Sequence, residues 1–195
     1  MNMYKKTKFK LLASVIAVGL TVGLAGCSAG DSEASEKEAA ASTYTEFVDG
    51  LLSIDSAKAD ALFAELQTKY AGVETATDEQ KKEVIDSFIS LAPQTYALVD
   101  LGSMTLDEQG SAIAGTASYS DYFKDVDLEI TVPDSAVTVN DDKATIDRSK
   151  IVVKGIEKPD ADSKPTQELE PVTLVKKNDK WLLSSTLGLL SEATQ

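Results

Sequence analysis

The sequence contains no histidine and only one cysteine among its 195 residues. Serine-histidine and cysteine-histidine triads therefore lack their general base, and zinc sites built from these two residue types lack their ligands. A single cysteine cannot close a disulfide within one chain, so packing must stabilise the fold. The sequence also has no Gly-x-Gly-x-x-Gly or phosphate-binding loop. These absences favour a protein that is not an enzyme and that holds no cofactor.

Basic residues are scarce as well, because 19 lysines and arginines stand against 32 acids and leave a net charge of −13. A nucleic-acid-binding protein needs a basic face to neutralise phosphates, so we expect no nucleic-acid partner. We interpret the acidity as a solvated surface that keeps the protein soluble, in preference to specific capture of cations.

The N-terminal segment carries lysines but no acids up to Lys10. An uncharged, mostly apolar run then begins at Leu11 and closes with Leu24-Ala25-Gly26-Cys27. A basic segment, a short apolar segment and small residues at its end are typical of a secretory signal peptide. The run is too short to cross a hydrocarbon core of about 30 Å. The sequence therefore predicts a cleaved signal peptide over residues 1–26 rather than a transmembrane helix.

The four residues that end this segment resemble the lipobox of bacterial lipoproteins, in which small residues stand directly before a cysteine. This resemblance implies that Cys27 carries a diacylglyceryl group and becomes the new N-terminus. Two acyl chains anchor a protein stably, whereas one chain holds it only marginally. We therefore expect a lipoprotein that is lipid-anchored on the extracytoplasmic face of the cell membrane.

The segment that begins with the cysteine, residues 27–41, contains no large apolar side chain. Such a segment cannot join a core, so the sequence predicts a lipid-anchored flexible tether there. A single domain is then expected over residues 42–195, and it should fold without the tether. Thr43 and Glu46 fit a capping box that would open its first helix.

Two further helices are predicted from helical spacing of apolar residues. The first runs from Asp55 or Ser56 to about Gly72, and the second opens with a capping box at Thr77 and ends or kinks at Pro93. The apolar residues that the earlier of these helices directs to one side are Ala59, Leu62, Phe63, Leu66 and Tyr70. Residues 94–101 fit either a continued helix or a strand.

After about residue 103 the apolar period becomes two, which is typical of strands. Its clearest example alternates acidic and apolar residues: Asp125, Val126, Asp127, Leu128, Glu129 and Ile130. Hairpins are predicted over residues 137–146 and 172–184, a short strand over 151–153, an exposed loop over 158–170 and a short helix over 187–190. Helices first and an antiparallel meander afterwards indicate an α+β domain, in which the helices cover one face of a curved sheet.

The segment over residues 171–184, PVTLVKKNDKWLLS, resembles the closing hairpin of nuclear transport factor 2-like domains. It has an apolar strand, a polar turn and a strand that begins with a tryptophan. The helical first half and the later meander are similar to that cone-shaped fold. The tail from Trp181 to Leu190 also resembles small exported actinobacterial members of the family. The resemblance implies a cone whose interior is either open to a ligand or filled by side chains.

Some members of that fold are isomerases or cyclases that use an aspartate base and a tyrosine or acid beside an apolar cavity. The residues of these types in the present sequence are Asp100, Tyr119, Asp121 and Tyr122. We interpret them in the first place as surface aspartates and tyrosines at the rim of the core. The enzyme remains the alternative to a binding protein.

Two other features are candidate ligand sites. The densest carboxylate group, Asp121, Asp125, Asp127 and Glu129, offers oxygen ligands that calcium favours. Its spacing fails the EF-hand pattern because Ile130 stands where the turn glycine belongs, so we expect a wet strand face and no metal site. Trp181 could line a pocket, but a tryptophan in a closing strand packs more often in the core.

The sequence thus predicts a non-enzymatic envelope lipoprotein that binds a small apolar ligand or another envelope protein. The alternative is a cone-fold enzyme of the isomerase or cyclase type acting on an apolar small molecule. The interior of the cone separates these possibilities. A cavity above roughly 300 Å³ favours a small ligand or a substrate, whereas an interior filled by side chains favours interaction with a protein.

Overall fold

The computed structural model describes residues 29–117, 128–155 and 170–184. Helices precede strands, and every strand pair is antiparallel, so the α+β class is confirmed. The helices are α1 (Ala29–Leu52), α2 (Ser56–Lys69), α3 (Asp78–Ile89), α4 (Pro93–Tyr96) and α5 (Leu106–Ala117), with short 3₁₀ turns η1 (Leu101–Ser103), η2 (Asp134–Ala136) and η3 (Arg148–Lys150). The strands are β1 (Glu129–Thr131), β2 (Val137–Asn140), β3 (Lys143–Ile146), β4 (Val152–Lys154), β5 (Val172–Lys177) and β6 (Lys180–Leu183).

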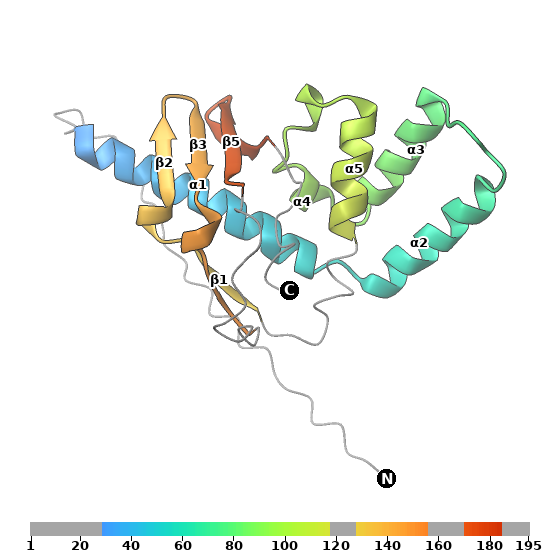
Figure 1. Ribbon diagram of the computed structural model, residues 1–195, viewed down its shortest axis with the longest axis horizontal. Coiled ribbons are helices and arrows are strands. Elements are labelled where there is room, and N and C mark those ends of the chain that lie inside the picture. The colour runs from blue at the N-terminus through green and yellow to red at the C-terminus, as the bar shows by residue number, and fades with distance from the viewer. Residues whose placement is uncertain (1–28, 118–127, 156–169, 185–195) are drawn as a thin grey trace, which may run out of the picture.

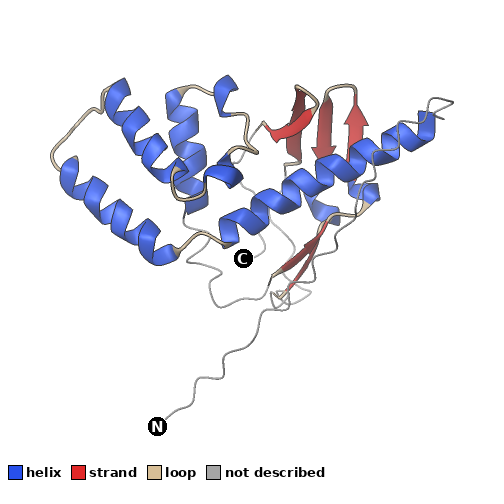
Figure 2. Ribbon diagram, turned by 180° about the vertical axis from the view of Figure 1, so that it is seen from behind, coloured by secondary structure: helices blue, strands red, loops and turns tan. Residues whose placement is uncertain are grey.

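The long helix α1 lies across one face of a four-stranded sheet of order β2-β3-β5-β6 (Figure 1). The remaining helices gather beyond its C-terminal end, where α1 contacts α4, α3 packs on α5, and α2 packs on α3. Strands β1 and β4 form a separate two-stranded ribbon. Figure 2 shows the same arrangement from behind, with α1 running the length of the sheet and reaching the helices.

The flexible tether predicted over residues 27–41 is wrong from Ala29 onward, because α1 begins there. Ala40 has no exposed surface, and Glu36 accepts hydrogen bonds from two residues of the sheet. Large apolar side chains are thus not needed for this segment to pack, since a small alanine and a carboxylate lie against the sheet instead. The structured domain therefore includes residues 29–41, and the boundary predicted at 42 is too late.

The capping box predicted at Thr43 is also wrong, because the Thr43 hydroxyl donates to the Ala39 carbonyl inside α1. The one predicted at Thr77 is confirmed: its hydroxyl accepts from the Gln80 amide, and the Gln80 side chain accepts from the Thr77 amide. Asp55 caps α2 in a similar way by accepting from the amides of Ala57 and Lys58. Helix starts near residues 55 and 77 are thus confirmed.

Helix α2 follows its predicted face only in part. Ala59 and Leu66 are buried, whereas Phe63 is 53% exposed. Phe63 lies on the flank of the buried stripe, and α2 packs mainly on α3, so only a narrow row of its side chains is covered.

The strand period predicted after residue 103 is wrong for α5, which is helical and opens with hydrogen bonds between Thr105 and Glu108. The ambiguous residues 94–101 form α4 and a short extended stretch beside β6. There the Asp100 amide donates to the Leu183 carbonyl, and the Leu183 amide donates to the Leu98 carbonyl. Pro93 occupies the first turn of α4, where a missing amide hydrogen costs nothing.

The predicted hairpins are confirmed. β2 pairs with β3, and β5 pairs with β6 so that Lys176 stands opposite Trp181. Asn178 and Asp179 both have positive φ, at 50° and 60°, which matches the right-handed twist of the strands that they join. The predicted strand at 151–153 appears as β4 and ends before Gly155, whose φ is 96°. The loop over 158–170, apart from Glu170, and the helix over 187–190 lie outside the described residues.

Candidate functional site

The inner face of the four-stranded sheet is filled by side chains of α1. Tyr44, Phe47 and Leu51 are at most 1% exposed. The sheet residues Ile146, Leu174 and Leu183, which belong to the same core, have no exposed surface. At these positions the interior is packed as a core rather than open to a ligand.

Trp181 lies in this core and is 4% exposed, so the core interpretation of Trp181 is confirmed. Its Nε1–H donates to Glu36 Oε2 over 2.9 Å, and Lys176 Nζ donates to Glu36 Oε1 over 2.6 Å. Lys176 Nζ also lies 5.8 Å from the centre of the indole ring, within the range of a cation–π contact. The hydrogen bond from Lys176, assisted by the one from Trp181, outweighs desolvation and lowers the pKa of Glu36. This group fastens α1 to the sheet.

Asp100, the first of the residues that the enzyme alternative would use, is bound in an ion pair. Its Oδ2 lies 2.7 Å from Lys177 Nζ, and its side chain is 9% exposed. Burial raises the pKa of Asp100, but hydrogen bonds from Lys177 and Ser103 and the charge of Lys177 outweigh burial, so the pKa lies below its ordinary value. Such a carboxylate stays ionised and paired, which makes it a poor general base at neutral pH.

Of the other candidate site residues, only Glu129 lies within the described ranges. Tyr119, Asp121, Tyr122, Asp125 and Asp127 lie outside the described residues, as does Cys27. Glu129 of the proposed carboxylate group pairs with Lys154 across the β1–β4 ribbon. Within the described ranges no group of three or more acids, histidines or cysteines is placed to hold a metal ion.

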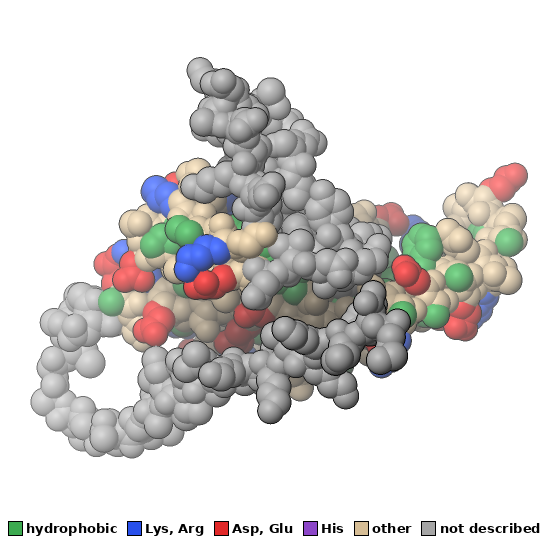
Figure 3. Space-filling model, turned by 90° about the horizontal axis from the view of Figure 1, so that it is seen from below, with side chains coloured by type: hydrophobic (Ala, Val, Ile, Leu, Met, Phe, Trp, Pro, Cys, Tyr) green, Lys and Arg blue, Asp and Glu red, His purple; other side chains and the backbone are tan. Residues whose placement is uncertain are grey.

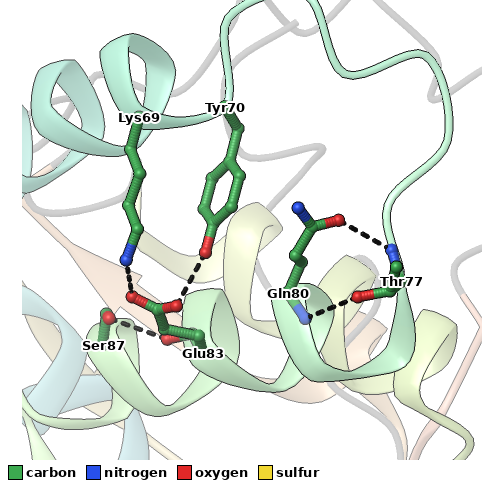
Figure 4. Close-up of polar contacts among 6 residues, drawn as sticks. All are labelled: Lys69, Tyr70, Thr77, Gln80, Glu83 and Ser87. Atoms are coloured by element: carbon green, nitrogen blue, oxygen red, sulfur yellow. Dashed lines mark hydrogen bonds and ion pairs between the residues drawn. The ribbon is translucent and has the colours of Figure 1, made fainter.

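A polar groove of about 590 Å³ follows the exposed side of α3. It is lined by Glu79, Lys82, Glu83, Asp86, Ser87 and Ser90. Figure 4 shows how Glu83 is held: Lys69 Nζ and the Tyr70 hydroxyl, both at the end of α2, donate to its carboxylate. These hydrogen bonds, that of Lys69 first, lower the pKa of Glu83. Lys82 pairs with Asp86 in the same groove, so most of its charges are matched internally.

A second groove, of about 380 Å³, lies where the end of α1 meets the connection from α3 to α4. We call it the α1–α4 groove. It is lined by Gly50, Ser53, Ile54, Leu91, Ala92, Pro93, Gln94 and Thr95, none of which carries a charge. Thr95 is only 7% exposed, and its hydroxyl makes no hydrogen bond with any described residue.

The groove exists because α1 and α4 approach closely at Gly50. A Cβ atom at Gly50 would stand 2.2 Å from Thr95 Oγ1, far inside van der Waals contact. Only glycine therefore allows the Thr95 side chain to lie against the backbone of α1. Sequence reasoning missed this pair; a glycine near the end of an otherwise regular apolar helix was the available signal.

A second buried threonine, Thr116 of α5, has the opposite environment. It is 1% exposed, and its hydroxyl lies 3.0 Å from the Tyr96 hydroxyl and within 3.1 Å of the carbonyls of Ala112 and Ile113. Burial raises the pKa of Tyr96, so this tyrosine is a neutral hydrogen-bonding group at the C-terminal end of α4. The contrast shows that the lack of a partner at Thr95 is not general for buried threonines here.

Elsewhere the surface gives little sign of a single binding face. Figure 3 shows acidic, basic and apolar side chains interspersed where described residues are visible. The large apolar side chains that are exposed, Phe63, Val73 and Val152, are distributed over α2, the α2–α3 connection and β4. Among the described helices none combines the length and the apolar character needed to span a bilayer. No family model, curated protein or solved structure gives a significant match to the chain.

Proposed function

We propose that this chain is a cell-envelope lipoprotein, anchored through a diacylglyceryl group on Cys27, that binds another envelope protein and catalyses no reaction. We also propose that its domain is a variant of the nuclear transport factor 2-like cone. The order of the elements and the closing hairpin led by Trp181 support that fold. The lipobox-like residues before Cys27 support the anchor and the extracytoplasmic location.

The filled inner face of the sheet favours a protein partner over an apolar ligand or substrate. A ligand-binding cone needs an open interior, typically of 300–1,000 Å³. Here Tyr44, Phe47 and Leu51 occupy the space against Leu174 and Leu183 with at most 1% of any of these residues exposed. Asp100, the described candidate for a catalytic base, is paired with Lys177 instead of facing a cavity.

The start of α1 gives the anchor a defined reach. Only Ser28 separates Cys27 from Ala29, and two residues of extended chain span at most about 7 Å. A lipid on Cys27 would therefore hold the start of α1 close to the bilayer. Glu36 fixes this helix to Trp181 and Lys176 of the sheet, so the body follows the orientation of α1.

Two measurements test the proposal. Radiolabelled fatty acid should enter the full chain expressed in a bacterial host and should not enter Cys27→Ala; equal labelling of both would refute the anchor. Benzene should cause no saturable shift in the methyl NMR signals of Leu51, Ile146 and Leu174. A saturable shift there would mean an accessible interior and would favour the isomerase or cyclase alternative.

A further inference from the structure

The α1–α4 groove differs from the α3 groove and from the groove between α1 and η2 in having no charged lining residue. The α3 groove is lined by four charged residues among six, and the groove between α1 and η2 includes Glu38 and Asp134. In a chain in which 26% of the residues are charged, an uncharged concavity excludes charged ligands by desolvation rather than by repulsion.

The groove also contains a polar group that the protein itself does not satisfy. The Thr95 hydroxyl is buried and has no partner among the described residues. Leaving a buried hydroxyl unpaired costs its full desolvation, and native structures rarely retain such groups. A ligand that accepts a hydrogen bond from Thr95 would remove that cost when it binds.

Gly50, which lies against Thr95, also carries an acceptor without a described backbone partner. The Gly50 carbonyl receives no backbone hydrogen bond from the described residues, because the Ser53 amide donates to Asp49 and the Ile54 amide donates to Leu51. The missing Cβ of Gly50 lets Thr95 Oγ1 approach the same residue. A donor and an acceptor thus border one groove whose walls include the apolar Ile54, Leu91 and Pro93.

We propose that the α1–α4 groove binds an uncharged, extended peptide segment with small apolar side chains. In an extended peptide the N–H and the carbonyl of one residue point to the same side, so one residue supplies a carbonyl that accepts from Thr95 and an N–H that donates to Gly50. Its alkyl side chains cover Ile54, Leu91 and Pro93. The volume of about 380 Å³ suits a few small residues. This inference rests on the proposed function, since it names the kind of partner segment that the protein binds.

The test is a titration of the full chain in lipid nanodiscs, followed by the amide NMR signals of Gly50, Ser53 and Thr95. The probe is acetyl-Ala-Ala-Ala-amide, with acetyl-Ala-Glu-Ala-amide and acetyl-Ala-Lys-Ala-amide for comparison. We expect saturable shifts at these three residues and at least threefold weaker binding of both charged peptides. Thr95→Val should weaken the neutral peptide roughly three- to tenfold, as the loss of one neutral hydrogen bond does.

Two control variants separate binding from folding. Thr95→Ser keeps the hydroxyl and should retain the affinity, whereas Thr138→Val makes the same chemical change on an exposed strand position and should alter nothing. Three results would each overturn the inference: no saturable shift, shifts confined to residues outside the groove, or unchanged affinity in Thr95→Val. Failure of the proposed function would show in other measurements: fatty acid would not label Cys27, or benzene would shift the methyl signals of the inner face.

Discussion

Replacing Thr95 by valine should not destabilise the protein, which is unusual for the removal of a polar group from a threonine that is 93% buried. The hydroxyl has no partner among the described residues, so valine, which has nearly the same shape, breaks no hydrogen bond. The usual cost of an unpaired buried hydroxyl is about 1–3 kcal/mol. Thr95 borders a groove that opens to solvent, so we expect the gain from removing its hydroxyl to lie at the lower end of that range.

We therefore expect the free energy of unfolding of Thr95→Val to equal that of the wild type or to exceed it by up to about 1 kcal/mol. In a chain of this size, 1 kcal/mol corresponds to a rise of about 2–4 °C in the melting temperature. Helix propensity does not interfere, since threonine and valine are nearly equal in helices.

Thr116→Val is the matched comparison, with the same change at a threonine that is 1% exposed. Here valine removes the contact with the Tyr96 hydroxyl and leaves that hydroxyl buried without its partner. The expected loss is about 1–3 kcal/mol. Urea unfolding followed by circular dichroism measures both variants. A loss above about 1 kcal/mol in Thr95→Val would refute the reasoning, because it would mean that the Thr95 hydroxyl is hydrogen-bonded.

Four further results are expected. Trp181→Ala should lower the free energy of unfolding by roughly 3–5 kcal/mol, and wild-type fluorescence should be blue-shifted; red-shifted, quenchable emission would contradict its 4% exposure. Because folding lowers the pKa of Asp100, this residue stabilises the fold at pH values above its unfolded pKa of about 4, and that stability is lost as the pH falls through its folded pKa. Asp100→Asn should therefore flatten the acid side of a plot of unfolding free energy against pH. An unchanged plot would exclude the ion pair as the cause of the acid-side slope. Deleting residues 1–41 should lower the melting temperature, because it removes the fully buried Ala40. An unchanged melting temperature would mean that residues 29–41 are a tether after all. A donor dye on Ser35→Cys should transfer energy to a bilayer acceptor more efficiently than the same dye on Ser53→Cys, and equal transfer would mean that α1 lies flat.

The two threonine capping boxes show what a sequence pattern can and cannot decide. Thr77 follows a turn that contains Gly72 with a φ of 82°, so the chain before it is not helical and the cap can form. Thr43 follows alanines, glutamates and one lysine, which favour helix, and α1 continues through it. The motif is the same in both places, and the preceding residues determine whether it starts a helix.

Helix α5 was missed although its start carries the same signal. The Thr105 hydroxyl accepts from the Glu108 amide, and Glu108 accepts from the Thr105 amide. The hydrogen bonds of Thr105 lower the pKa of Glu108. The helix that follows is rich in alanine and glycine, so its apolar period is weak and the strand pattern of the neighbouring residues is the stronger signal. The closing hairpin was predictable because Asn178 and Asp179 tolerate the left-handed turn that joins β5 to β6.

The α1–α4 groove depends on a pairing that no local pattern contains. Gly50 lies near the end of one helix and Thr95 lies in another, and their proximity follows from how α4 packs on α1. The same α1 begins next to Cys27, contacts Trp181 through Glu36 and ends at the groove. At 1.5 Å per residue its axis measures about 36 Å. If Cys27 carries the lipid, one continuous helix joins the membrane anchor, the filled sheet and the uncharged groove, and it separates the groove from the anchor by most of its own length.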